Sequence, residues 1–348
     1  MSELLLSLRD LRVGFPVSGG IWRRDRVLRA VDGVDLDLHA GEALGIVGES
    51  GCGKSTLARA ILQLVRPSAG TVVWLGRPLE GLSRRELRPL RRDLQIVFQD
   101  PLASLDPRMS VGEIVAEPLR VHAAALSAAQ RRAAVIDILA RVGLPADVLG
   151  RYPHEFSGGQ CQRIGIARAM VLRPKLLVCD EPVSALDVSI QAQIVNLLLE
   201  LKRDSGMSVL FVSHNLAVVR RVCERVLVLY LGKPMELAPT EQVFASPRHP
   251  YTQGLLAAVP IPDPRVQPAR LGQSLAGELP SPLSPPSGCV FRTRCPRAID
   301  ACASTEPSLQ HVGLAHQVAC TRVEPQGGPM ISHHSPAAPT STPDHSPA

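Results

Sequence analysis

A glycine-rich run at residues 48–55 could bind phosphate. It reads Gly-Glu-Ser-Gly-Cys-Gly-Lys-Ser and fits the pattern G-x-x-x-x-G-K-[ST]. Glycines let the backbone turn tightly enough for its N–H groups to face phosphate oxygens, and a helix beginning at the Lys adds partial positive charge. A chance glycine-rich turn would lack the Lys-Ser pair between a strand and a helix. The predicted nucleotide-binding residues here are Gly48, Glu49, Ser50, Gly51, Cys52, Gly53, Lys54, Ser55 and Thr56.

Two side chains of this run have predicted roles in phosphate chemistry. Lys54 should reach the β- and γ-phosphates of a nucleotide, and the Ser55 hydroxyl should bind Mg²⁺. Cys52 is interpreted as a small filler rather than a nucleophile, because the sequence implies no base beside it.

A second candidate is the apolar run at residues 176–179, which ends in the carboxylates Asp180 and Glu181. In phosphate-loop ATPases the Asp at such a strand end holds Mg²⁺. The adjacent Glu181 is then placed to polarise the attacking water. Alone, an Asp-Glu pair would be an ordinary surface feature, and the phosphate loop upstream is what favours the catalytic interpretation.

Between these motifs lies the run Ser157-Gly158-Gly159-Gln160, which resembles the signature motif of ABC ATPases. Taken alone, the first three residues would be a plain helix N-cap. The resemblance implies that this motif completes the ATP site of a facing subunit, so that ATP is sandwiched between two cassettes.

The resemblance extends to three further positions. Gln99 resembles the Q-loop glutamine, which senses Mg²⁺ and couples to membrane subunits, and Asp187 lies in a run that resembles the D-loop. His214 resembles the switch histidine that contacts the γ-phosphate. The implied catalytic residues are therefore Glu181, His214 and Lys54, and the implied Mg²⁺ ligands are Ser55, Gln99 and Asp180.

The aromatic side chain that stacks on adenine in this family is harder to assign. Phe15 is the first choice and Trp22 the second, because both precede the phosphate loop in the appropriate region. Either could instead be a packing residue.

Residues 99–108, 181–189 and 249–252 resemble the dipeptide and oligopeptide importers within this family, although Asp106 stands where they usually have Asn. The resemblance implies an ATPase on the cytoplasmic face of the cell membrane that powers peptide import. Its implied partners are a second ATPase subunit (the same or a related chain), two membrane permeases and, through them, an extracytoplasmic solute-binding protein. Relatives carry nickel, glutathione or cell-wall peptides, so the solute stays open.

Two other classes of function fit the sequence less well. A soluble ABC ATPase acting on nucleic acid or ribosomes would commonly carry two cassettes or long coiled-coil insertions, and this chain has one cassette and no long heptad run. A phosphate-loop kinase would lack the signature at Ser157. The net charge of +6 is mild for 348 residues and does not by itself indicate nucleic acid, which is not an expected partner.

Four of the eight cysteines gather near the C-terminus, at Cys289, Cys295, Cys302 and Cys320. Their spacing lacks the C-x2-4-C pairs of a zinc ribbon and differs from ferredoxin runs. Peptide-importer ATPases carry a similar extension, and some hold a [4Fe–4S] cluster on four Cys. We expect such a cluster here, with zinc or no metal as alternatives. His316 is a possible outer-shell partner, although plain polar surface is the stronger expectation. The remaining cysteines are expected to be packing residues: Cys52, Cys161, Cys179 and Cys223.

The elements that must position these residues alternate between strands and helices, which indicates an α/β fold with a largely parallel sheet. The predicted strands are 4–13, 71–75, 94–98, 176–179, 209–212 and 226–229, and two more lie within 30–47 on either side of a turn at 40–41. The predicted helices are 54–64, 111–120, 127–142, 162–172, 190–202 and 216–222, and Ser127 is the expected N-cap of the third. Residues 14–29 should form a loop or hairpin, and residues 83–95 are a basic segment with no assigned structure.

The resemblance implies a P-loop ABC ATPase cassette: a RecA-like parallel sheet core, an antiparallel β subdomain and a helical subdomain. The expected divisions are a nucleotide-binding domain at 1–245 with its helical subdomain at about 100–160, a cysteine-containing extension at 246–322 and a disordered tail at 323–348. Residues 259–288 are rich in proline and are expected to be a linker. We find no signal peptide and no run of about 18 apolar residues that would predict a transmembrane helix.

Overall fold

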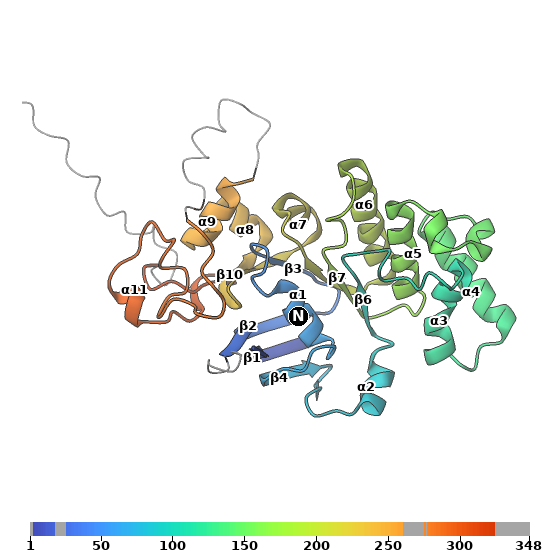
Figure 1. Ribbon diagram of the computed structural model, residues 1–348, viewed down its shortest axis with the longest axis horizontal. Helices are drawn as coiled ribbons and strands as arrows, with labels where there is room; N and C mark the ends of the chain where they lie inside the picture. The colour runs from blue at the N-terminus through green and yellow to red at the C-terminus, as the bar shows by residue number, and fades with distance from the viewer. Residues whose placement is uncertain (1–2, 18–25, 260–274, 276, 324–348) are drawn as a thin grey trace, which may run out of the picture.

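The computed structural model describes residues 3–17, 26–259, 275 and 277–323. Trp22, residues 324–348 of the predicted tail and residues 260–274 and 276 of the predicted linker lie outside these ranges. The described chain forms two β-sheets, with helices packed between them and on the outer face of the larger sheet (Figure 1).

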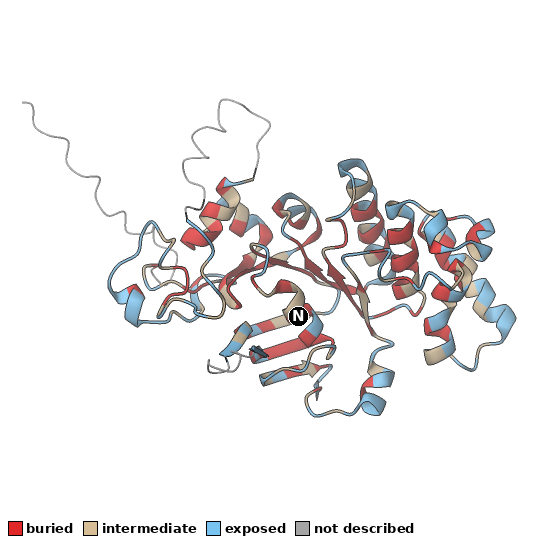
Figure 2. Ribbon diagram, viewed as in Figure 1, coloured by how far each residue is buried: buried red, intermediate tan, exposed pale blue. Residues whose placement is uncertain are grey.

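The larger sheet has eight strands in the order β11-β12-β10-β9-β3-β8-β7-β6. Five adjacent strands, from β9 to β6 in this order, run parallel to one another, which confirms the predicted largely parallel sheet. They are β3 (Ala43–Val47), β6 (Leu94–Val97), β7 (Leu176–Asp180), β8 (Ser208–Val212) and β9 (Arg225–Tyr230). Every residue of β3, β7 and β8 is buried, as expected for parallel strands covered on both faces (Figure 2).

The smaller sheet is antiparallel throughout and has the order β2-β1-β4-β5. Its strands are β1 (Leu4–Val17), β2 (Arg26–His39), β4 (Ala69–Trp74) and β5 (Arg77–Pro78). Residues 14–29 were predicted to form either a loop or a hairpin, and the pairing of Val17 with Arg26 confirms the hairpin. Both of its strands are longer than predicted.

Helix α1 (Lys54–Ile61) packs between the two sheets, and its Leu57 and Ile61 belong to the same buried cluster as Leu44 of β3. Alternate residues such as Val47 face the opposite side, where α3 (Val111–His122), α4 (Ala128–Arg141), α5 (Gly158–Met170), α6 (Val188–Ser205) and α7 (Leu216–Val222) contribute to a second core. The sheet therefore separates two cores, and α1 ends three residues before the predicted Leu64.

Three helices of the helical region begin with the same serine capping motif. Ser110, Ser127 and Ser157 cap α3, α4 and α5, each in a capping box closed by the residue three positions on. The predicted cap at Ser127 is thus confirmed. Helix α5 begins at Gly158, four residues before the predicted 162, because Ser157 is its N-cap. Two short 3-10 turns, Ala146–Gly150 and Pro153–Glu155, lead into it.

Several elements were not predicted. Helix α2 (Arg84–Leu90) lies in the basic segment, and β10 (Lys233–Pro239), α8 (Thr240–Ala245) and α9 (Pro250–Ala257) follow β9. Near the C-terminus come α11 (Ala301–Ser304), β11 (Gln310–Gly313) and β12 (His316–Val318). Since β12 pairs with β10, the extension adds two strands to the central sheet.

A buried carboxylate of β10 binds three residues of this extension. Glu236 is fully buried, accepts the backbone N–H groups of Arg248 and His249, and lies 2.7 Å from Nε2 of His316. His316 is only 5% exposed, so the expectation that it is polar surface was wrong. Burial lowers the pKa of His249 to about 4, which keeps this imidazole neutral near pH 7.

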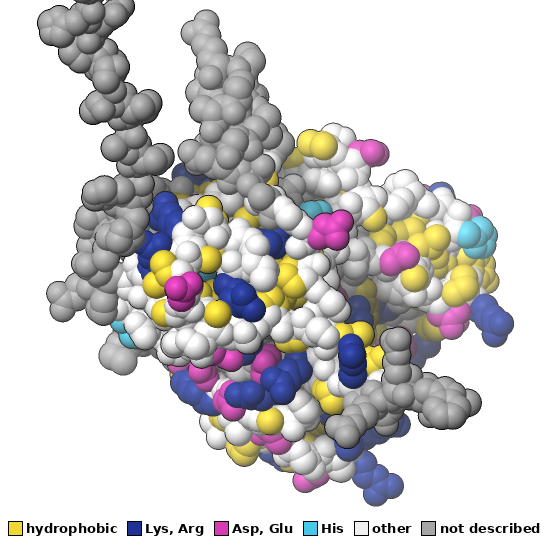
Figure 3. Space-filling view, turned by 60° about the vertical axis from the view of Figure 1, so that its left-hand side comes forward, with side chains coloured by type: hydrophobic (Ala, Val, Ile, Leu, Met, Phe, Trp, Pro, Cys, Tyr) yellow, Lys and Arg dark blue, Asp and Glu magenta, His cyan; other side chains and the backbone are white. Residues whose placement is uncertain are grey.

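On the outside, Lys233 of β10 joins the extension to the smaller sheet, because it pairs with Glu306 and, at 2.9 Å, with Asp32 of β2. Within the smaller sheet, Arg12 pairs with Asp32 at 3.0 Å. Figure 3 shows this side of the molecule, where acidic and basic side chains lie intermixed. Within the described residues, no helix combines the length and the apolar character needed to span a bilayer.

Candidate nucleotide-binding site

A cleft of about 300 Å³ opens beside the phosphate loop. It is bounded by the loop itself, by the smaller sheet and by the ends of β6 and β7. Its lining residues are Phe15, Leu28, Arg29, Ala30, Ser50, Gly51, Gly53, Lys54, Ser55, Thr56, Gln99, Glu181, Leu231, Gly232 and Pro282. Of the predicted site residues outside the loop, Phe15, Gln99 and Glu181 line this cleft.

The loop conformation depends on glycine at two positions. Gly53 has φ 102°, and a Cβ there would lie 2.0 Å from the Ala30 carbonyl oxygen. A Cβ on Gly48 would lie 2.2 Å from the Leu229 carbonyl oxygen. No side chain fits at either position, so the loop can approach the neighbouring strands only with glycine.

Lys54 turns back over this loop. Its Nζ donates to the carbonyl oxygens of Gly48 and Glu49, both at 2.9 Å, and the side chain is 4% exposed. A cation is thus held at the mouth of the backbone cradle, where phosphate charge would lie.

The predicted Mg²⁺ ligands Ser55 and Asp180 are brought together. The Ser55 hydroxyl donates to Oδ1 of Asp180 at 2.6 Å, and Arg59 lies 3.5 Å from Oδ2. Asp180 is fully buried at the end of β7. An alcohol and a carboxylate are hard oxygen donors of the kind that Mg²⁺ prefers, so this pair fits the ion.

Glu181 is the meeting point of the predicted catalytic side chains. Its carboxylate lies 4.0 Å from Nζ of Lys54, 3.3 Å from Nδ1 of His214 and 3.2 Å from Nε2 of Gln99. Because β6, β7 and β8 are neighbouring parallel strands, the residues that follow them converge at one edge of the sheet. The backbone of Glu181 has φ 48°, a conformation that costs energy for a residue with a side chain.

Phe15 lines the cleft and is 38% exposed, which leaves its ring accessible to a ligand. Arg29, Gly232 and Pro282 also line the cleft and were not predicted from the sequence. Gly232 directly follows an apolar strand, a pattern that indicates a turn, whereas no sequence motif marks Pro282 of the extension as a site residue.

The signature residues do not line this cleft. Ser157 caps α5, and its hydroxyl accepts from the backbone N–H of Gln160. Gly159 faces Ile190, where a Cβ would lie 2.7 Å from the side chain, and Gly158 faces Leu186. Asp187 is the N-cap of α6. These residues do not line the cleft beside the chain's own phosphate loop. That they complete the ATP site of a facing subunit stays a prediction.

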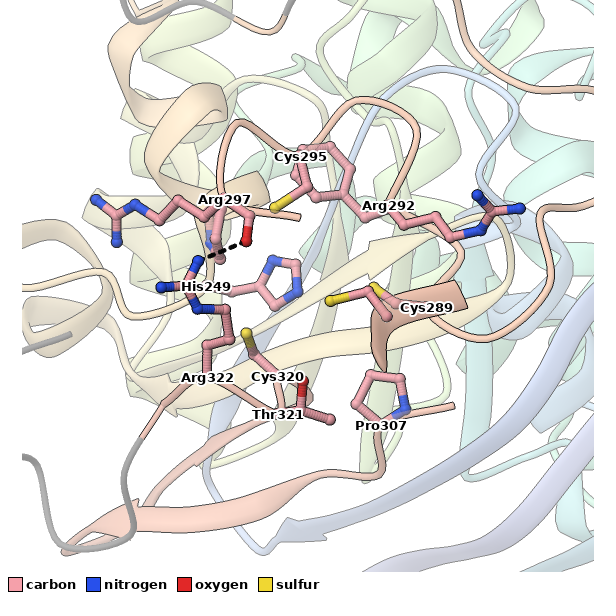
Figure 4. A pocket seen from close by; sticks show the side chains of 12 residues that line it. His249, Cys289, Arg292, Cys295, Arg297, Pro307, Cys320, Thr321 and Arg322 are labelled. Atoms are coloured by element: carbon pink, nitrogen blue, oxygen red, sulfur yellow. Dashed lines mark hydrogen bonds between the residues drawn. The ribbon is translucent and has the colours of Figure 1, made fainter. Parts of the chain in front are cut away.

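The four C-terminal cysteines line a single pocket together with His249, Arg292, Arg297 and Arg322. In Figure 4 the sulfur atoms of Cys289, Cys295 and Cys320 point toward a common space. All four are free thiols, and burial raises the pKa of Cys289 to about 11. The enclosed space is about 20 Å³, room for about one water molecule.

In the described part of the chain, no group of three or more His, Cys, Asp or Glu side chains is arranged to hold a metal ion. The other four cysteines are all buried among cassette elements, consistent with packing: Cys52, Cys161, Cys179 and Cys223. Burial raises the pKa of each of these thiols.

Comparison with known proteins agrees with this geometry. The family model described as ABC transporter matches residues 31–184, and that described as Oligopeptide/dipeptide transporter, C-terminal region matches residues 235–302. The oligopeptide transport ATP-binding protein OppF of Escherichia coli is 55% identical over 326 residues, which cover 93% of this chain and 97% of that protein. OppF of Haemophilus influenzae is 52% identical and covers 92% and 98%, respectively.

Solved structures agree on the fold. A dimeric ATP-binding cassette in a post-hydrolysis state, bound to ADP and Pi, has a TM-score of 0.62 and 30% identity and covers 68% of this chain and 99% of its own. The cbiO1 protein of Clostridium perfringens, part of an ABC transporter complex, has a TM-score of 0.60 and 28% identity and covers 70% and 92%. The predicted P-loop ABC ATPase fold is thereby confirmed, and the chain belongs to the ABC transporter family, among the ATP-binding proteins of its oligopeptide and dipeptide transporters.

Proposed function

We propose that this chain binds and hydrolyses ATP to drive the import of oligopeptides or dipeptides across the cytoplasmic membrane. The observation that carries the proposal is the convergence of Lys54, Gln99 and His214 on Glu181 beside a glycine-dependent phosphate cradle. The peptide assignment is supported by the oligopeptide transport proteins, which match over nearly the whole chain, extension included.

In the proposed mechanism, Lys54 moves from the loop carbonyls onto the β- and γ-phosphates, and Phe15 stacks on the adenine ring. Mg²⁺, held by Ser55 and Asp180 with Gln99 nearby, would neutralise charge on the phosphates. Glu181 orients water for in-line attack and takes its proton, while His214 steadies the γ-phosphate. The contacts on Glu181 hold its carboxylate in place before the nucleotide enters.

A second cassette completes each site in this proposal. Ser157, Gly158, Gly159 and Gln160 lie at the N-terminus of α5, where backbone N–H groups and the helix dipole favour a phosphate. Because they stand outside the chain's own cleft, we assign them to the nucleotide of a partner ATPase, and Asp187 to the contact between the two cassettes.

The partners proposed beyond the second ATPase are two membrane permeases and an extracytoplasmic solute-binding protein. The chain would then lie at the cytoplasmic face of the membrane. Nickel, glutathione or cell-wall peptide remains the alternative cargo, because no residue of an ATP-binding cassette contacts the solute.

A transport assay tests this proposal. The full chain, purified with the membrane proteins that accompany it, should show ATP-dependent uptake of labelled peptides into proteoliposomes. Two polytopic subunits should copurify. Copurification with ribosomes or nucleic acid instead of membrane proteins would favour the alternative of a soluble ABC ATPase, and uptake of nickel or glutathione but no peptide would reassign the cargo.

We further propose that the four-cysteine pocket holds a [4Fe–4S] cluster, which would supply a compact crosslink among Cys289, Cys295, Cys302 and Cys320. Four free thiols and three arginines line one pocket, which supports this proposal. The free space of about 20 Å³ is smaller than a cluster, so these side chains would have to move apart to admit one.

Iron and sulfide analysis checks the cluster. After anaerobic isolation, the chain should contain about four irons and show the broad visible absorption of a cluster, and Cys295→Ser should lose both. Cys161→Ser is the matched control, because that thiol is buried in α5 away from the pocket. One zinc per chain, or equal iron in both variants, would argue against the cluster.

A further inference from the structure

Glu49, the second residue of the phosphate loop, is held by the C-terminal extension. Its backbone N–H donates to the Tyr251 hydroxyl at 2.9 Å, and its carboxylate accepts both terminal nitrogens of Arg294, at 2.6 and 3.0 Å. Its carbonyl oxygen accepts from Lys54. The N–H, the carbonyl and the carboxylate of this one residue are therefore all hydrogen-bonded, two of them to residues that lie more than two hundred positions further along the chain.

The Arg294 contact has the features of a positioning interaction. The guanidinium binds the carboxylate through two nitrogens, which fixes direction as well as distance. Its side chain is 5% exposed, its guanidinium carbon lies 5.9 Å from the centre of the Tyr230 ring, and the bond to Glu49 raises its pKa. This pair is far less solvated than the exposed ion pairs elsewhere on the molecule.

The same turn lines the four-cysteine pocket. Arg294 directly precedes Cys295, and Phe291 lines the pocket as well. The Phe291 ring lies 5.3 Å from those of both Tyr230 and Tyr251. A rearrangement of the cysteines in this pocket would therefore displace Arg294 and Tyr251, the two residues that hold Glu49. The displacement would pass through the turn that carries Cys295 and through the packed rings of Phe291, Tyr230 and Tyr251.

We propose that the extension acts as a clamp on the phosphate loop, with Arg294 and Tyr251 as positioning residues, and that this clamp couples the four-cysteine pocket to nucleotide affinity. The clamp keeps the cradle ordered before phosphate arrives, which reduces the entropy lost on binding. It also neutralises the Glu49 carboxylate, which would otherwise repel the phosphates. The inference rests on the nucleotide site of the proposed function.

Nucleotide binding by the full chain tests the clamp. Arg294→Met should weaken binding of a fluorescent ATP analogue by about five- to twentyfold, within the usual range of coupling between sites. Replacing Glu49 with Gln should make the Arg294 substitution much less harmful, because the unpaired charge is then absent. Arg9→Met is the matched control, since Arg9 makes a similar two-nitrogen pair with Asp37 on the smaller sheet and should change affinity less than twofold.

Coupling must be reciprocal, so nucleotide should also stabilise the turn. Hydrogen exchange of residues 289–297 should slow several-fold with nucleotide in the parent chain and in Arg9→Met, but not in Arg294→Met at saturating nucleotide. The clamp proposal would be overturned if Arg294→Met and the parent chain bound nucleotide with equal affinity. It would also be overturned if nucleotide did not change the hydrogen-exchange rate of residues 289–297 in the parent chain. Failure of the parent chain to bind nucleotide at all would instead overturn the proposed function.

Discussion

Replacing Glu181 with glutamine should lower ATP turnover by about 10²-fold or more while leaving ATP binding intact. The substitution keeps the side-chain shape but removes the negative charge and the basicity that a proton acceptor needs. Glu181 is 13% exposed, and Lys54 and His214 both lie beside its carboxylate. Since neither the phosphate cradle nor the Ser55–Asp180 pair depends on that charge, nucleotide affinity should hold.

Phosphate release and equilibrium nucleotide binding, measured on the same preparation with its partner subunits, check this prediction. Glu241→Gln is a suitable control, because Glu241 is an exposed carboxylate paired with Arg220 on the surface. Turnover of Glu181→Gln within threefold of the parent would remove Glu181 from the role of base.

Lys54→Ala should fail at the earlier step, with nucleotide affinity reduced by about 10²-fold, the cost of losing a buried charged partner. The Lys54 ammonium is 4% exposed and is held by two loop carbonyls, so it is already oriented toward the cradle. Without it, the phosphate loop loses its buried cation, and Glu181 loses a positive neighbour.

The two variants should therefore separate binding from chemistry. Lys175→Ala is the matched control for Lys54, because Lys175 is 55% exposed and its pair with Asp93 is long, at 3.9 Å. Unchanged nucleotide affinity in Lys54→Ala, measured by equilibrium binding, would contradict the assignment of this lysine.

Short-range patterns were sufficient to predict most of the cassette. Residues 43–55 form a strand, a loop and a helix in direct succession, so the chemistry and the elements that support it lie within one window of sequence. The convergence around Glu181 could also be anticipated, because the carboxyl ends of parallel strands share one edge of a sheet. Helix α2 was missed although Ser83 and Glu86 form a capping box, since its arginine-rich sequence and Pro89 obscure the pattern.

Long-range contacts could not be anticipated in the same way. Strands β11 and β12 are four and three residues long, too short for a periodic pattern, and β12 pairs with β10, which lies about eighty residues earlier in the chain. His316 illustrates the consequence, because this polar residue is buried opposite Glu236 of β10.

The sequence by itself determined that this chain carries a phosphate loop, an acidic strand end and a signature turn, since each is a local arrangement of backbone and side chain. Only the tertiary structure decided that Arg294 and Tyr251 meet Glu49 and that β12 pairs with β10. Such contacts join residues whose separation along the chain leaves no local trace, because packing of the whole fold places them together.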